Sequence, residues 1–135
     1  MISEKSGLAR TLTRGVLAIA AGFTAVAVLS LGTDAIMRAL GYFQPGAEAR
    51  GEFDPFTLVL LYRSMFGIGG SWIAAALAPG HPMRHALAVG GIGMAVAIAW
   101  AVSMTAAEFG PAWYPWALVL IIMPCAWLGG LLAQN

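Results

Sequence analysis

The sequence has 135 residues, of which 60% are hydrophobic and 10% are charged, and its formal net charge is +1. Soluble domains carry about 25% charged residues, so this chain cannot cover a water-facing surface and is expected to lie in a lipid bilayer. The small net charge, without a basic tract, argues against a nucleic-acid partner. The single cysteine, Cys125, lies in an apolar run, which is typical of a small buried hydrophobic residue.

Four apolar segments follow one another along the chain, separated by charged residues and prolines. They cover about 15–40, 56–78, 85–107 and 116–133. Each is close to the ~20 residues that a helix rising ~1.5 Å per residue needs to cross ~30 Å of hydrocarbon. An alternating pattern of strand length is missing, so helices are expected rather than a closed barrel. The sequence predicts a single all-α domain over 1–135, an up-down bundle of four transmembrane helices made of two hairpins.

The first segment has a second interpretation as a signal peptide, because Lys5, Arg10 and Arg14 precede it. The apolar run 16–31 is long for the core of a signal peptide, and no clear Ala-x-Ala cleavage site follows it. An uncleaved transmembrane helix is therefore favoured.

The positions of the basic residues predict the orientation of the bundle. With the N-terminus inside, one side of the membrane holds Lys5, Arg10, Arg14 and Arg84, whereas the outer side holds Arg50, with Arg38 at the outer border. The positive-inside rule then places both termini in the cytoplasm. Aromatic residues at 42, 43, 113, 114 and 116 fall where an outer aromatic belt is expected.

Several short motifs resemble those of a group of small bacterial membrane proteins of unassigned function. The motifs are LSLGTD at 29–34, Tyr62-Arg63 with Phe66-Gly67, PMRHAL at 82–87, GPAWYP at 110–115 and PCAWLGG at 124–130. The resemblance covers most of the chain after the N-terminal tail. It implies a four-helix, multi-pass protein of the bacterial inner (plasma) membrane, and it supplies no catalytic or binding residue.

Asp34, Arg38 and Arg63 are the informative charges. Asp34 and Arg38 are four residues apart and share a helix face. By helix rise, Asp34 and Arg63 lie about 9 Å and about 10 Å from the outer ends of neighbouring helices. Because an unpaired charge at such depth costs at least ~2.5 kcal/mol, a direct or water-bridged Asp34–Arg63 pair is expected. The pair is interpreted as a device that sets helix register; the alternative is an intramembrane polar site for an ion, a proton or a solute, which would also include Arg38 and Glu108.

Two further patterns have a structural and a functional interpretation. His81 and His85 are spaced for a metal, but Pro82 takes His81 off the regular helix face and no acidic or thiol ligand stands nearby, so no metal is expected. Trp72, Trp100 and Trp127 lie within the spans and are assigned to bundle packing, with a lipophilic ligand pocket as the alternative.

Small residues recur at helical spacing in the second and third segments. They are Gly67, Gly70, Ala74 and Ala78 in one, and Ala86, Gly90, Gly93, Ala97 and Ala101 in the other. Such stripes let helices pack closely in lipid, so these two helices are expected to pack through them.

The sequence favours a non-enzymatic accessory or structural membrane protein. The alternative is a small transporter or channel with its polar site in the outer half of the bundle. An enzyme acting on a lipid is disfavoured, because the chain lacks a paired-carboxylate site or a Ser/His/acid set. No cofactor is expected; the expected partners are the lipid bilayer and either further copies of this chain or a larger membrane complex.

Overall fold

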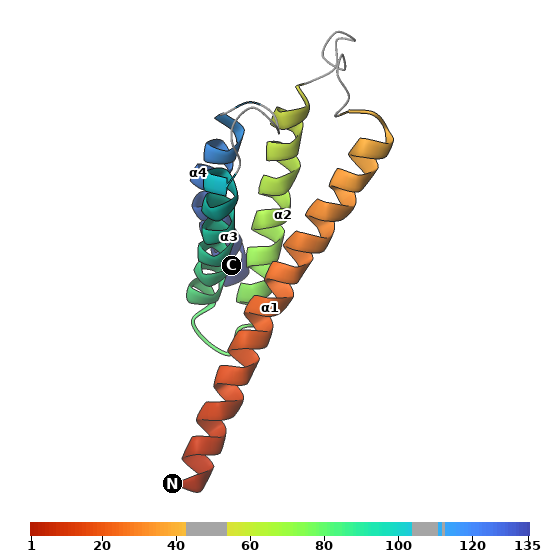
Figure 1. The fold of residues 1–135 in the computed structure, drawn as a ribbon. Helices are drawn as coiled ribbons and strands as arrows, with labels where there is room; N and C mark the ends of the chain where they lie inside the picture. The colour runs from red at the N-terminus through yellow and green to blue at the C-terminus, as the bar shows by residue number, and fades with distance from the viewer. Residues whose placement is uncertain (43–53, 104–110, 112) are drawn as a thin grey trace.

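The fold is an up-down bundle of four helices in a computed structural model that describes residues 1–42, 54–103, 111 and 113–135. The helices are α1 (Ile2–Ala39), α2 (Pro55–Leu77), α3 (Pro82–Ser103) and α4 (Trp113–Gln134), and successive helices run in opposite directions (Figure 1). Each is long and apolar enough to cross a membrane. The predicted all-helical fold with four membrane spans is confirmed.

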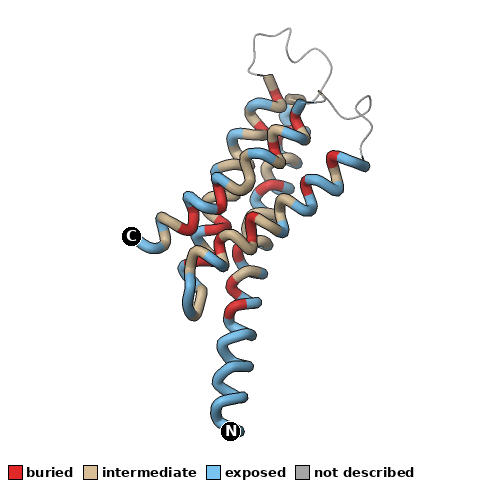
Figure 2. The backbone as a smooth tube through the Cα atoms, turned by 90° about the vertical axis from the view of Figure 1, so that its left-hand side faces the viewer, coloured by how far each residue is buried: buried red, intermediate tan, exposed pale blue. Residues whose placement is uncertain are grey.

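α1 is much longer than the first apolar segment, because the helix begins at Ile2 and not near residue 15. Its 38 residues extend about 57 Å at ~1.5 Å per residue, well beyond the ~30 Å of a hydrocarbon core. Residues 1–14 are exposed and project past the other three helices (Figures 1 and 2). This segment has no proline and is rich in residues that favour helix, so the helix continues where contact with the bundle ends.

Local sequence signals explain the helix ends. α1 ends at Ala39, and Gly41 follows its C-cap. The positive φ of 83° at Gly41 suits glycine and lets Tyr42 N–H donate to Met37 O at 3.1 Å. α2 begins with Asp54 as its N-cap, which accepts from Thr57 N–H at 3.1 Å. Pro55 fits the first helical turn because the missing N–H has no partner there.

α1 and α2 cross at two glycines. A Cβ added at Gly70 would lie 2.6 Å from the carbonyl oxygen of Gly22, so the two backbones are in direct contact at this point. Beyond the crossing, towards the ends joined by residues 43–53, the two helices diverge (Figure 1). The buried residues gather in the zone where the helices overlap (Figure 2).

The small-residue stripes contact helices other than those expected. α2 and α3 do touch each other, but Gly70 faces Gly22 on α1, and a Cβ at Gly90 would lie 3.3 Å from Met123 Sδ on α4. The prediction that α2 and α3 pack through these glycines is therefore wrong. The physical reason is that α4 packs against both α2 and α3, and its approach uses the small residues of α3. A stripe of small residues indicates that a helix packs closely against another helix, but it does not identify which one.

Aromatic rings connect α2, α3 and α4 at the end expected to face outwards. Tyr114 lies 5.4 Å from Phe56 and 6.0 Å from Trp100, measured between ring centroids. Tyr114 is only 4% exposed, whereas Trp113 and Trp116 are about half exposed. Tyr114 therefore turns its ring into the bundle, and the expected aromatic belt at this level stays a prediction.

Candidate functional site

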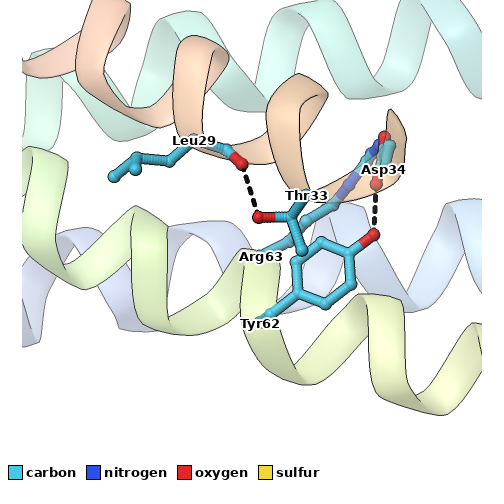
Figure 3. Close-up of polar contacts among 5 residues, drawn as sticks. All are labelled: Leu29, Thr33, Asp34, Tyr62 and Arg63. Carbon is cyan, nitrogen blue, oxygen red and sulfur yellow. Dashed lines mark hydrogen bonds and ion pairs between the residues drawn. The ribbon is translucent and has the colours of Figure 1, made fainter. Parts of the chain in front are cut away.

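A polar cluster joins α1 and α2 where the two helices diverge. The Tyr62 hydroxyl donates to Asp34 Oδ1 (Figure 3). Arg63 Nη2 lies 2.5 Å from Asp34 Oδ2, so each carboxylate oxygen accepts one hydrogen bond. The predicted direct pair between Asp34 and Arg63 is present. Thr33, beside the cluster, donates to Leu29 O within its own helix at 2.7 Å (Figure 3).

Tyr62 is the member of the cluster that sequence reasoning missed. Consecutive residues of a helix point about 100° apart, so Tyr62 and Arg63 converge on one carboxylate only because both side chains are long. The available signal was that a tyrosine hydroxyl inside a membrane span needs a partner.

Arg38 lies one turn beyond Asp34 on α1 and does not join the pair. Its side chain is exposed, and it forms no ion pair or side-chain hydrogen bond with any residue in the described part of the chain. Glu108, the fourth residue of the predicted polar site, lies outside the described residues. A functional role for the four residues stays a prediction, and Asp34, Arg38 and Arg63 are the three whose positions are known.

These three charged side chains line a cavity of about 470 Å³ that is bordered by all four helices and partly open to the surroundings of the bundle. Phe23, Val26 and Leu31 contribute from α1, and Val89, Val96 and Trp100 contribute from α3. Leu118, Ile121, Ile122 and Cys125 contribute from α4. The lining is thus mostly apolar, with its charged groups contributed by α1 and α2.

The three tryptophans within the spans have different surroundings. Trp100 lines the cavity, whereas Trp72 and Trp127 are 46% and 51% exposed on the outside of the bundle. The pocket interpretation therefore applies to Trp100 alone. Trp72 and Trp127 face the surroundings of the bundle, which differs from the predicted packing inside it.

His81 lies in the turn between α2 and α3, and His85 lies in the first turn of α3. His81 has a positive φ of 49°, and its carbonyl oxygen is 3.1 Å from His85 Nδ1. Within the described ranges, no group of three or more His, Cys, Asp or Glu residues could hold a metal ion. The contact between the histidines explains their spacing as a feature of the turn.

Comparison with models of protein families, with curated proteins and with solved structures finds no match.

Proposed function

We propose that this chain is a non-enzymatic accessory protein of the bacterial plasma membrane that binds a lipid-like molecule in the cavity between its helices. The observation that carries the proposal is the cavity of about 470 Å³ with a mostly apolar lining. Binding sites for small molecules have volumes of about 300–1,000 Å³, are mostly apolar with a few polar groups, and occur between the helices of bundles.

The size of the cavity argues against a purely structural bundle. Helices that associate in lipid gain from van der Waals packing against one another, and a cleft of this size between four helices forgoes part of that packing. A bundle whose only role was support would gain by closing this space with larger side chains. Instead, small residues line it, among them Ala27, Gly67 and Gly93. An alkyl chain from the bilayer would restore the missing van der Waals contacts.

A cavity-filling variant with a matched control tests the proposal. Ala27 lines the cavity, whereas Ala21 lies on the exposed side of the same helix. We expect native mass spectrometry of the wild type, released from a mild detergent, to show a retained lipid-like adduct. Ala27→Phe should lose the adduct, and Ala21→Phe should keep it. A wild type without any adduct, or equal retention by Ala27→Phe, would overturn the proposal.

Transport is the second candidate, and the position of the charged pair favours it. Asp34 and Arg63 line the cavity and are therefore not sealed within a helix–helix contact. In ion and solute pathways, charged residues likewise face a cavity. Proton flux into proteoliposomes, read with an internal pH dye, tests this function. Wild-type flux above that of protein-free vesicles, lowered by Asp34→Asn, would support it, and flux equal to the protein-free rate would reject it.

A further inference from the structure

The charges lining the cavity do not balance. Asp34, Arg38 and Arg63 are the Asp, Glu, Lys and Arg residues among the described lining. Two guanidinium cations against one carboxylate leave one positive charge in excess. Arg38 stands one residue before the end of α1 and its side chain is exposed, so the excess positive charge lies near the outer border of the span, where lipid head groups are expected. The excess therefore favours an occupant that carries a negative charge.

The hydrogen-bonding groups show the same imbalance. Both oxygens of Asp34 already accept a hydrogen bond, from Tyr62 and from Arg63. A guanidinium has five N–H donors, and Arg63 directs only Nη2 at Asp34, while its buried Nε has no partner in the described structure. Arg38 has no side-chain acceptor among the same residues. Donors thus exceed acceptors at this end of the cavity.

The position of the charges along the bundle matches the dimensions of a lipid. Asp34 lies about 7.5 Å, by helix rise, from Ala39 at the end of α1, and Arg38 is one turn nearer that end. The apolar lining continues from there towards the Gly22–Gly70 crossing, through Phe23, Val26 and Ala27. A head group bound at the arginines would lie near the boundary between head groups and hydrocarbon, with its alkyl chain directed towards the middle of the membrane.

Resting on the proposed binding function, we infer that the ligand is an amphiphile with a singly charged anionic oxygen head group, which Arg38 and Arg63 bind while the apolar lining encloses the alkyl chain. A fatty-acid carboxylate and a phosphate-ester lipid share this chemistry. Arginine suits both, because its planar donors match carboxylate and phosphate oxygens.

Three probes with the same chain and different head groups test the inference. Oleate, oleyl alcohol and oleylamine are titrated against the purified full-length protein in a neutral detergent, and binding is read as the shift in melting temperature. We expect oleate to bind about tenfold or more tightly than oleyl alcohol, which is the effect of one charge-assisted hydrogen bond. Dioleoyl phosphatidylglycerol, tested in parallel, should displace oleate if the site accepts phosphate esters, whereas acetate and inorganic phosphate should not.

Arg38→Gln is the deciding variant, because Arg38 can be removed without breaking the Asp34–Arg63 pair. It should reduce oleate binding about tenfold and leave oleyl alcohol binding unchanged. Arg14→Gln also removes one positive charge, from the exposed projecting part of α1. It should change neither oleate binding nor oleyl alcohol binding. If Arg14→Gln weakens oleate as much as Arg38→Gln, the effect is one of overall charge and the inference fails.

The location of the ligand is read from Trp100, which lines the cavity. A dibrominated stearate should quench the fluorescence of the wild type more than that of Trp100→Phe. Equal quenching would place the chain outside the cavity and reject the inference.

The outcomes separate this inference from the function on which it rests. Equal affinity for oleate and oleyl alcohol, both lost in Ala27→Phe, would overturn the anionic head group and keep the binding function. Preference for oleylamine would assign recognition to Asp34 and overturn the inference. Displacement of oleate by acetate or phosphate would reject an amphiphile in favour of a small anion. If oleate, oleyl alcohol and oleylamine all failed to bind, both the anionic head group and the proposed binding function would be overturned.

Discussion

Asp34 accepts its two hydrogen bonds from consecutive residues of α2, so one carboxylate determines both the height and the rotation of α1 against its neighbour. The pair spans the part of the bundle where the two backbones have separated, and only long side chains reach across it. Asp34 is 13% exposed and Arg63 is 27% exposed, so the pair is partly accessible. This position lets one pair serve the fold and the cavity together.

The Asp34–Arg63 pair should show a favourable coupling energy. Asp34→Asn and Arg63→Gln should each lower the free energy of unfolding by about 1.5–3 kcal/mol, the usual range for hydrogen bonds to charged groups. The double variant should lose less than the sum, because the single variants each leave one charge unpaired. Unfolding in mixed detergent micelles provides the double-mutant cycle. Strictly additive losses would show that the two side chains do not stabilise one another.

Tyr62→Phe isolates the hydroxyl contribution, because the substitution keeps the ring and removes only the donor to Asp34. We expect a loss of about 1 kcal/mol or more and a weaker coupling between Asp34 and Arg63. Tyr42→Phe is the control, since the Tyr42 side chain has no hydrogen bond within the described structure. Equal effects from both substitutions would show that the Tyr62–Asp34 contact contributes nothing specific.

Part of this cluster was predictable from depth alone. With the helix ends that the sequence predicts, Asp34 and Arg63 stand about 9 Å and about 10 Å from the ends of adjacent antiparallel helices, and the cost of a charge in lipid makes pairing the expected result. Tyr62 was not predicted, because neutral polar groups carry a smaller penalty and have more possible partners. The cavity beside the pair depends on the angle at which α1 crosses α2, and hydropathy does not contain that angle.

At the scale of helices, α1 and α2 make contact through backbone at one crossing point. Small residues at that point permit the close approach that helix association in lipid requires. Gly22 and Gly70 therefore determine how far apart the diverging ends of the two helices lie, and hence the width of the cavity. The sequence stripes correctly indicated a close contact of α2 but assigned it to the wrong partner helix.

Gly70→Ala should destabilise the bundle by about 1–3 kcal/mol, which is the usual effect of overpacking. Its Cβ would lie 2.6 Å from Gly22 O, so α1 has to move away from α2. The adjacent Gly69→Ala is a matched control, because its Cβ would meet nothing within 4 Å. Melting temperatures in detergent should fall for Gly70→Ala and hold for Gly69→Ala. If the melting temperature fell equally in Gly70→Ala and Gly69→Ala, the close contact at the crossing would not be the cause.

At the scale of the whole molecule, bilayer thickness explains why the spans were predictable. The observed α2, Pro55–Leu77, differs by about one residue at each end from the expected 56–78, because proline and an acidic cap mark its boundaries. The start of α1 at Ile2 was not predicted, because hydropathy indicates only which residues contact lipid. A helix can continue into water, where hydropathy gives no signal for it. The projecting residues 1–14 are polar enough to leave the hydrocarbon, and four spans place both termini on the same side of the membrane.

Which side that is follows from charge and is the last prediction. Lys5, Arg10, Arg14 and Arg84 share one side, so the positive-inside rule places that side in the cytoplasm. A membrane-impermeant maleimide applied to intact cells should label Gly46→Cys, in the connection between the first two spans, and should not label Gly80→Cys until the membrane is opened. Gly80 is exposed at the turn before α3, and a side chain there meets nothing within 4 Å.

The native Cys125 is 5% exposed, so the unsubstituted protein should stay unlabelled. Labelling of Gly80→Cys but not Gly46→Cys in intact cells would show the inverted topology and would move the arginine end of the cavity to the cytoplasmic leaflet.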